Sequence, residues 1–178
     1  MRKILYIILI LISSCKESQK ISETIEEKFH LPKSEYVILT HKQDWFWVFS
    51  NKNQAEITPS KLSESELITI EKIVTIAINN SNKAQKKKLL EHNHNYPKDV
   101  KTKTGYEINL DKYQRQYVPI LNALGEKEVW VNFFCKTSPS DKWHTNLVSV
   151  EDGGNCYFNI KINLNAKKYY DFDINRSI

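Results

Sequence analysis

The chain has 178 residues, with 26 lysine and arginine residues against 21 aspartate and glutamate residues, for a formal net charge of +5 at pH 7. A charge this mild does not argue for a nucleic-acid partner, and with only four glycines the sequence contains no glycine-rich loop that could cradle a nucleotide phosphate. The length fits one domain that is large enough to bury a core.

The first 14 residues have the pattern of a secretory signal. Arg2 and Lys3 precede an apolar run of nine residues, 4–12, and two small serines follow. A membrane-spanning helix needs about 20 apolar residues, so this run is too short to cross a bilayer. We therefore expect residues 1–14 to be a signal peptide that is removed from the mature protein.

The end of this segment, Ile12-Ser13-Ser14-Cys15, resembles the lipobox of bacterial lipoproteins. The resemblance implies that the Cys15 sulfur receives a diacylglyceryl group and that the signal is cut before this cysteine. It also implies acylation of the new amino terminus, with chains such as palmitate. Two acyl chains hold a protein on a membrane without a transmembrane helix. Lys16 favours delivery to the outer membrane, with the leaflet and the face left open, and the alternative is a plain secretory signal beside a chance cysteine.

After the cysteine, residues 15–33 are polar and charged, and they predict a lipidated tether in front of a single domain over 34–178. The stretches "YVILT" and "WFWVF", separated by "HKQD", are rich in β-branched and aromatic residues. They predict an N-terminal β-hairpin over residues 36–50. "AEIT" adds a short strand before Pro59.

The next segment carries the main predicted helix. Ser63 and Glu66 have the spacing of a capping box, and the apolar residues that follow recur at helical spacing, so we expect a helix over residues 64–80. Residues 81–106 are polar and predict either a long loop or an extension of the helix followed by a loop. The run Lys86-Lys87-Lys88 within them is interpreted as a solvated helix end or loop.

The last 70 residues predict four strands in the stretches "YQRQYVPIL", "VWVNFFC", "CYFNIKINL" and "YYDFDIN". Polar turns join the first pair and the last pair, which favours an antiparallel meander. Alternation gives each strand one apolar and one more polar face, with Tyr170, Phe172 and Ile174 sharing the apolar face of the last strand. One helix packed on such a meander makes an α+β domain, with cystatin-like or NTF2-like folds as analogies.

Two cysteines fall in these strands. Cys135 closes one strand and Cys156 opens the next, and the alternation places both on the apolar face at the same end of the sheet. An exported protein meets an oxidising environment, so we expect a disulfide between them. Two buried free thiols or one reactive thiol are the alternatives.

The aromatic run at residues 45–49 offers a candidate binding face. In a strand, Trp45, Trp47 and Phe49 share one side, and Trp130 and Trp143 could extend it. Exposed aromatic side chains are typical of recognition surfaces, with an envelope protein or a glycan as the partner here. Since Phe46 and Val48 on the opposite side are also apolar, the alternative is a strand buried on both sides, and we expect Trp47 to belong to the core.

The sequence supplies no catalytic residue and no cofactor motif. His92, His94 and Glu91, with His144, have zinc-ligating side chains, but a polar surface loop is the simpler interpretation. Ser138 and Ser140 have no adjacent base, so neither is predicted to be a catalytic nucleophile. Asp171 and Asp173 are interpreted as a solvated strand face and not as part of a calcium-binding loop.

The stretches "GEKEVWVNFFC" and "DGGNCYFNIKINLNAKKYYDF" resemble the C-terminal half of a group of small, uncharacterised lipoproteins from Bacteroidetes-type bacteria. The similarity covers residues 104–175 and the lipoprotein start, and it implies fold and location without a catalytic residue. We expect a lipid-anchored envelope protein that acts as a non-enzymatic binding or structural module. The alternative is an envelope hydrolase or a metal-dependent enzyme.

Overall fold

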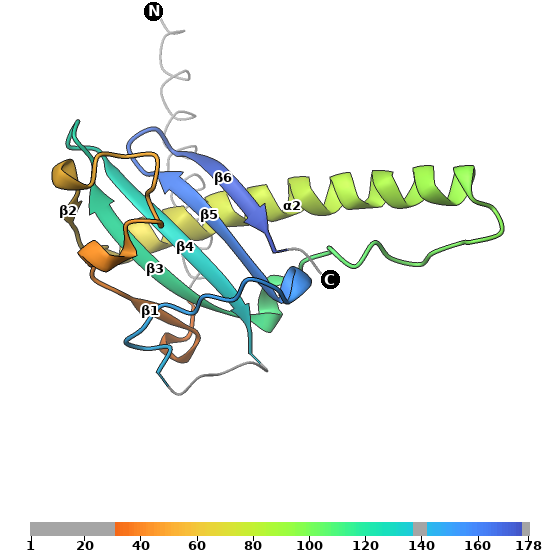
Figure 1. The fold of residues 1–178 in the computed structure, drawn as a ribbon, viewed down its shortest axis with the longest axis horizontal. Coiled ribbons are helices and arrows are strands. Elements are labelled where there is room, and N and C mark those ends of the chain that lie inside the picture. The colour runs from red at the N-terminus through yellow and green to blue at the C-terminus, as the bar shows by residue number, and fades with distance from the viewer. Residues whose placement is uncertain (1–30, 137–141, 176–178) are drawn as a thin grey trace, which may run out of the picture. The chain divides into compact units, whose positions relative to one another are not determined.

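The computed structural model describes residues 31–136 and 142–175. The predicted signal peptide, the lipidation residue Cys15 and most of the predicted tether lie outside the described residues, as do Ser138 and Ser140. The chain divides into Met1–Leu31 and a compact unit, Pro32–Ile178. Within the second unit one long helix packs on a six-stranded sheet, so the predicted α+β class is confirmed (Figure 1).

The sheet has the strand order β1-β3-β4-β5-β6, with β2 paired to β3. From β3 to β6 each strand runs antiparallel to the next, which confirms the predicted meander. β1 runs parallel to β3, so the sheet as a whole is mixed. The strands are β1 (Tyr36–Ile38), β2 (Thr58–Pro59), β3 (Tyr113–Leu121), β4 (Lys127–Cys135), β5 (Tyr157–Asn163) and β6 (Lys168–Ile174).

Helix α2 (Glu64–Asn95) begins at the predicted capping box. The Ser63 hydroxyl accepts a hydrogen bond from the Glu66 amide at 3.3 Å, and the Glu66 carboxylate accepts one from the Ser63 amide at 2.8 Å. The helix runs 15 residues beyond its predicted end at residue 80 (95 − 80), so the helix extension is the correct alternative for this region. The helix continues because the residues after 80 include lysine, alanine, glutamine and leucine, which are good helix formers. It ends shortly before Pro97, since helical geometry is disfavoured at the residue before a proline.

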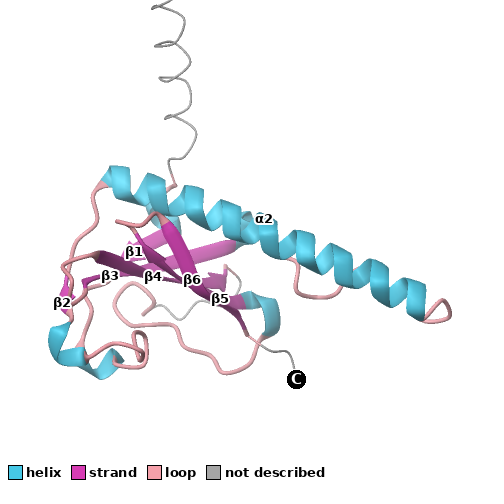
Figure 2. Cartoon of the chain, turned by 90° about the horizontal axis from the view of Figure 1, so that it is seen from above, coloured by secondary structure: helices cyan, strands magenta, loops and turns pink. Residues whose placement is uncertain are grey.

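Only the first part of α2 covers the sheet, as Figure 2 shows from above. Its buried residues and the inner face of the sheet form the main core, which includes Ile70, Val74, Ala77, Val131, Phe133, Phe158 and Ile160. The second part of the helix continues past the sheet, and the chain then returns toward η5 (Leu110–Lys112) and β3 (Figure 1).

The opposite face of the sheet carries a second core. Val118, Ile120 and Trp130 on this face are covered by Leu39, Trp45, Val48 and Phe49. Seven of the nine residues of β4 are buried, so its more polar face, which carries Glu128 and Asn132, is covered and not exposed to solvent. The alternation could not reveal this, because it reports strand geometry and not which other segments lie over the sheet.

The predicted hairpin over residues 36–50 is wrong. β1 has only three residues, and "WFWVF" contributes to η3 (Gln43–Trp45) and the turns after it. Trp45, Val48 and Phe49 are buried, a spacing that belongs to helical turns and not to a strand. The remaining short helices are η2 (Lys33–Glu35), η4 (Gln54–Glu56) and η6 (Gly154–Cys156).

A bulge alters the alternation in β6. The register shifts between Asn159 and Lys161, where Asp171 on the partner strand has a positive φ of 46°. Phe172 and Ile174 pack on the main core as predicted, but Tyr170 pairs with Lys161 and lies on the opposite face. The predicted shared face of these three β6 residues is therefore wrong at Tyr170, because an inserted residue reverses the alternation.

Candidate functional site

The aromatic face predicted from the sequence does not form. Trp45, Phe49, Trp130 and Trp143 are all buried. Trp47 is 42% exposed, and its ring meets that of Trp130 edge-on at a centroid distance of 5.7 Å. The expectation that the run is core is correct for Trp45 and Phe49 and wrong for Trp47. Phe46, on the side of the run that was also predicted to be buried, is 59% exposed. Four of the five residues of the predicted face are nevertheless buried, so the predicted set does not form a recognition surface.

Cys135 and Cys156 are joined by a disulfide, with their Cα atoms 5.0 Å apart. The bond links the end of β4 to the start of β5 and agrees with the expected pairing. Neither sulfur is therefore a thiol in this structure, which sets aside the alternatives of free or reactive thiols.

His92, near the end of α2, takes part in local contacts. The His92 Nε2 atom lies 3.0 Å from the Asp99 carbonyl oxygen and 3.3 Å from an Asp99 carboxylate oxygen. Asp171 pairs with the Lys161 amine at 3.1 Å. Across residues 31–136 and 142–175, no three side chains of the metal-binding types gather closely enough to hold an ion.

A buried ionic cluster lies between α2 and β3. The Tyr117 hydroxyl donates to a Glu71 oxygen at 2.5 Å, and the Arg115 Nε atom lies 3.3 Å from the other Glu71 oxygen. Burial raises the pKa of the Glu71 carboxyl, although Arg115 and the Tyr117 hydrogen bond act in the opposite direction. These groups are enclosed between helix and sheet, so the cluster is structural.

A second buried carboxylate, Glu128 of β4, lies on the opposite face of the sheet. It accepts hydrogen bonds from the Asn122 amide at 2.6 Å and from the Tyr170 hydroxyl, and the Lys52 amine lies 3.0 Å away. Burial, followed by this contact with Glu128, raises the pKa of Tyr170. Each Glu128 oxygen is already engaged, so the carboxylate is not free to act on a ligand.

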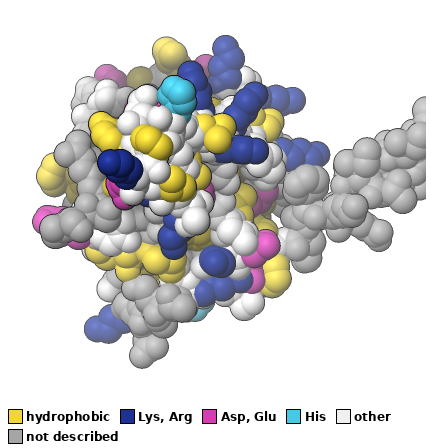
Figure 3. All heavy atoms as spheres, turned by 90° about the vertical axis from the view of Figure 1, so that its right-hand side faces the viewer, with side chains coloured by type: hydrophobic (Ala, Val, Ile, Leu, Met, Phe, Trp, Pro, Cys, Tyr) yellow, Lys and Arg dark blue, Asp and Glu magenta, His cyan; other side chains and the backbone are white. Residues whose placement is uncertain are grey.

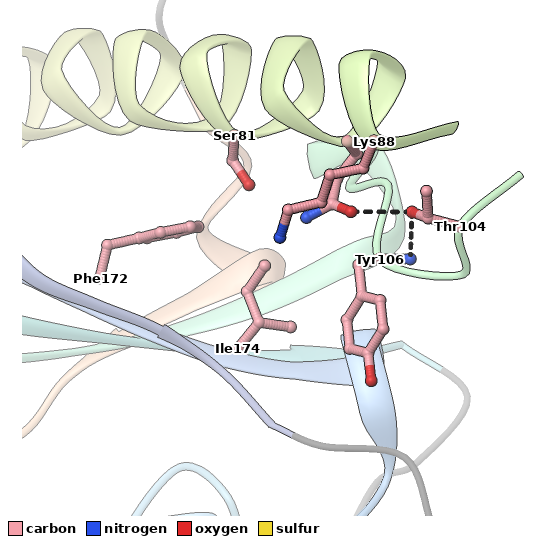
Figure 4. A pocket seen from close by; sticks show the side chains of 7 residues that line it. Ser81, Lys88, Thr104, Tyr106, Phe172 and Ile174 are labelled. Carbon is pink, nitrogen blue, oxygen red and sulfur yellow. Dashed lines mark hydrogen bonds between the residues drawn. The ribbon is translucent and has the colours of Figure 1, made fainter. Parts of the chain in front are cut away.

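The strongest candidate for a site is a groove of about 500 Å³ between α2 and the end of β6. Ser81, Gln85 and Lys88 of the helix form one wall, Phe172 and Ile174 of β6 form the floor, and Thr104 and Tyr106 close the other side (Figure 4). We call this set of seven residues the helix–sheet groove. Its volume lies in the range of small-ligand sites.

The groove combines an apolar floor with a polar rim that carries one cation. The Thr104 hydroxyl donates to the Gln85 side-chain oxygen at 2.9 Å and fixes the rim (Figure 4). The Lys88 side chain reaches from the helix into the open space (Figure 4). Lys88 and Tyr106 are the titratable side chains among the seven lining residues, which include no carboxylate, imidazole or thiol.

The loop that closes the groove is held in place by Glu107. Its carboxylate accepts hydrogen bonds from the Thr104 amide at 2.7 Å and the Gly105 amide at 3.0 Å, and Gly105 has a φ of +90°, which favours glycine. Burial opposes ionisation of Glu107 but is outweighed by these hydrogen bonds, which lower its pKa. Asn82 adds two hydrogen bonds to the backbone of Ile108, at 2.7 and 2.9 Å.

A second hollow of about 480 Å³ lies on the other side of this loop. Lys86, Lys103 and Lys112 line it together with Glu107. The sequence showed Phe172 and Ile174 as apolar strand residues, but it did not indicate that Lys88 and Tyr106 would face them. A longer helix, indicated by the run of helix formers after residue 82, is the signal that could have placed Lys88 there.

None of the described helices has both the length and the apolar character needed to span a bilayer. Comparison with models of protein families, with curated proteins and with solved structures found no match. The analogy with cystatin-like or NTF2-like folds therefore stays a prediction.

Proposed function

We propose that the protein is a lipid-anchored, non-enzymatic binding module of the bacterial cell envelope, held in the outer membrane through Cys15. Arg2 and Lys3, the short apolar run and the lipobox-like residues before Cys15 support the anchor. The disulfide between Cys135 and Cys156 is in keeping with an oxidising compartment. The resemblance of residues 104–175 to small Bacteroidetes-type lipoproteins points the same way.

The ligand is a small apolar molecule, or an apolar group of an envelope protein, that carries one negative charge. The observation behind this proposal is the helix–sheet groove, in which the apolar floor of Phe172 and Ile174 lies below the single amine of Lys88. Burial of apolar ligand surface on the floor supplies affinity, and the amine selects an anionic group. A lining without a carboxylate, imidazole or thiol is the reason for proposing binding rather than the alternative of an envelope hydrolase.

The anchor is tested by Cys15→Ala in cells fed radiolabelled palmitate. We expect the variant to lose the label and to leave the membrane fraction, because the acyl chains are the proposed attachment. A variant that still incorporates palmitate and still sediments with membranes would show that Cys15 is not the lipidated residue.

The groove is tested with a photoreactive diazirine derivative of a medium-chain fatty acid, followed by mass spectrometry of the labelled peptides. Labelling should concentrate on the peptides that contain Phe172 and Tyr106. Lys88→Gln should raise the probe concentration that gives half-saturated labelling by about tenfold, since a hydrogen bond to a charged group contributes about 1.5 kcal/mol or more. Lys87→Gln is the matched control, because Lys87 is the next residue but does not line the groove. Equal labelling of the two variants would rule out Lys88 as the anion-binding group.

A further inference from the structure

The second half of α2 and the chain that returns along it form a projecting unit, residues 81–105, which we call the basic arm (Figure 1). The returning chain is fixed to the helix. The Asn93 side chain donates to the Lys101 carbonyl at 2.9 Å and accepts from the Lys101 amide at 2.8 Å, and His92 contacts Asp99. The arm is thus a defined surface with its own hydrogen bonds.

The basic arm carries the net charge of the whole chain. It contains seven lysines and two acidic residues, so its formal charge is 7 − 2 = +5, equal to the +5 of all 178 residues. The rest of the chain therefore sums to zero. All seven lysines are exposed, and Figure 3, which faces the side toward which the arm points, shows lysine and arginine side chains gathered over one part of this view. The lysines are Lys83, Lys86, Lys87, Lys88, Lys98, Lys101 and Lys103.

Little of this charge is neutralised within the domain. Lys87 lies 3.7 Å from Glu91, and Lys101 lies 3.9 Å from Asp99, both in exposed positions where such pairs contribute little. In the part of the chain that the structure describes, the other five lysines of the arm have no carboxylate within ion-pair distance. A positive field of this kind attracts an anionic partner.

The arm also exposes large apolar side chains among the lysines. Leu90, Tyr96 and Val100 are 62%, 59% and 65% exposed. Leu90 lies on α2, and Tyr96 and Val100 lie on the chain that follows it. At a membrane surface, exposed apolar groups of this kind enter the headgroup region while neighbouring amines contact anionic lipids.

We propose that the basic arm is a second membrane contact. It binds the anionic phospholipid surface of the same membrane that holds the lipid anchor. This inference rests on the proposed function for its anchor. Cys15 precedes Pro32 by 32 − 15 = 17 residues, which span at most about 60 Å, so the anchored domain stays within reach of the surface. Each lysine near such a surface changes the ratio of docked to undocked protein by about fivefold.

The experiment places a fluorescent probe on the arm of the full lipidated chain. Leu90→Cys labelled with a nitrobenzoxadiazole dye is reconstituted into vesicles of phosphatidylcholine alone or with phosphatidylglycerol. The added thiol is the single target, because Cys135 and Cys156 are bonded and Cys15 carries the lipid. The same label on Leu124→Cys, 82% exposed in the β3–β4 turn away from the arm, is the matched control. We expect a blue shift and brighter emission at Leu90 only, in phosphatidylglycerol vesicles only.

Charge variants separate electrostatic docking from other effects. Lys83, Lys86 and Lys87 are changed together to glutamine, which spares Lys88 of the helix–sheet groove. The docked-to-undocked ratio should fall by about a hundredfold, and 1 M salt should release the arm since the Debye length shortens to about 3 Å. Changing Lys61, Lys167 and Lys168 to glutamine alters the charge equally outside the arm and should leave the signal unchanged.

Failure of the anchor and failure of the arm give different results. Flotation with phosphatidylcholine vesicles in 1 M salt, where the arm does not bind, reports the anchor alone. A chain that does not float there but still gives the salt-sensitive Leu90 signal with phosphatidylglycerol would support the arm without the anchor. Equal emission from the probe at position 90 in the two vesicle types would overturn the proposal. So would a signal that changes neither with salt nor with the lysine substitutions. A probe that responds only to added polyglutamate would assign the arm to an acidic macromolecule and would also overturn it.

Discussion

Replacing Arg115 with methionine should destabilise the protein strongly and in a pH-dependent way. Arg115 and Glu71 are both almost fully buried, and the Arg115 Nε atom lies 3.3 Å from a Glu71 oxygen. Methionine fills a similar volume but removes the cation, which leaves a buried carboxylate with the Tyr117 hydroxyl as its remaining hydrogen-bond partner. Breaking a buried ion pair in this way costs about 3–5 kcal/mol in the free energy of unfolding.

The dependence on pH follows from the direction of the Glu71 pKa. Burial already raises this pKa above its ordinary value of 4.5, and the loss of Arg115 should raise it further. Above pH 4.5 the folded variant then keeps a proton that the unfolded chain has released. The free energy of unfolding therefore falls as pH rises toward the folded pKa, by up to about 1.4 kcal/mol per pH unit. The cost of Arg115→Met should be smaller at pH 5 than at pH 8.

Urea unfolding of four proteins at both pH values measures this effect: the wild type, Arg115→Met, Glu71→Leu and the double variant. The double variant should recover most of the stability, because two apolar side chains replace the pair. Lys87→Met, which breaks the exposed pair with Glu91, is the control and should cost less than about 0.5 kcal/mol. Additive costs for the two buried changes, or a cost of Arg115→Met that does not vary with pH, would refute the reasoning.

Four further changes test the disulfide, the second core and the helix start. Replacing Cys135 and Cys156 together with alanine should lower the free energy of unfolding by about 3 kcal/mol, since the bond spans a sequence separation of 21 residues; an unchanged urea midpoint would contradict this. Phe49→Ala, in the second core, should cost about 3–5 kcal/mol. Trp47→Ala should cost only about 0.5–1.5 kcal/mol, because the ring is 42% exposed and contacts the Trp130 ring edge-on. A lower melting temperature for Trp47→Ala than for Phe49→Ala would show that Trp47, and not Phe49, is the core residue. Ser63→Ala should lower the free energy of unfolding by about 1 kcal/mol, because it removes the capping box. Circular dichroism during thermal unfolding measures this, and an unchanged midpoint would argue against the cap.

The sequence by itself determined the features that depend on neighbours along the chain. Alternating apolar residues marked β3 to β6, and the Ser63–Glu66 spacing marked the start of α2, because both signals come from local backbone geometry. The expected link between Cys135 and Cys156 followed from the same alternation, since it placed both residues on one face at one end of the sheet.

Tertiary structure decided where distant segments meet. The run at residues 45–49 has high strand propensity, yet it forms a 3-10 helix and turns because burying Trp45, Val48 and Phe49 over the second face of the sheet outweighs that propensity. The bulge at Asp171 places Tyr170 on the opposite face of the sheet, and the alternation of apolar residues does not reveal such an inserted residue. The helix–sheet groove joins Lys88, Tyr106 and Phe172, which are far apart in the sequence, and only the packing of α2 across the sheet brings them together.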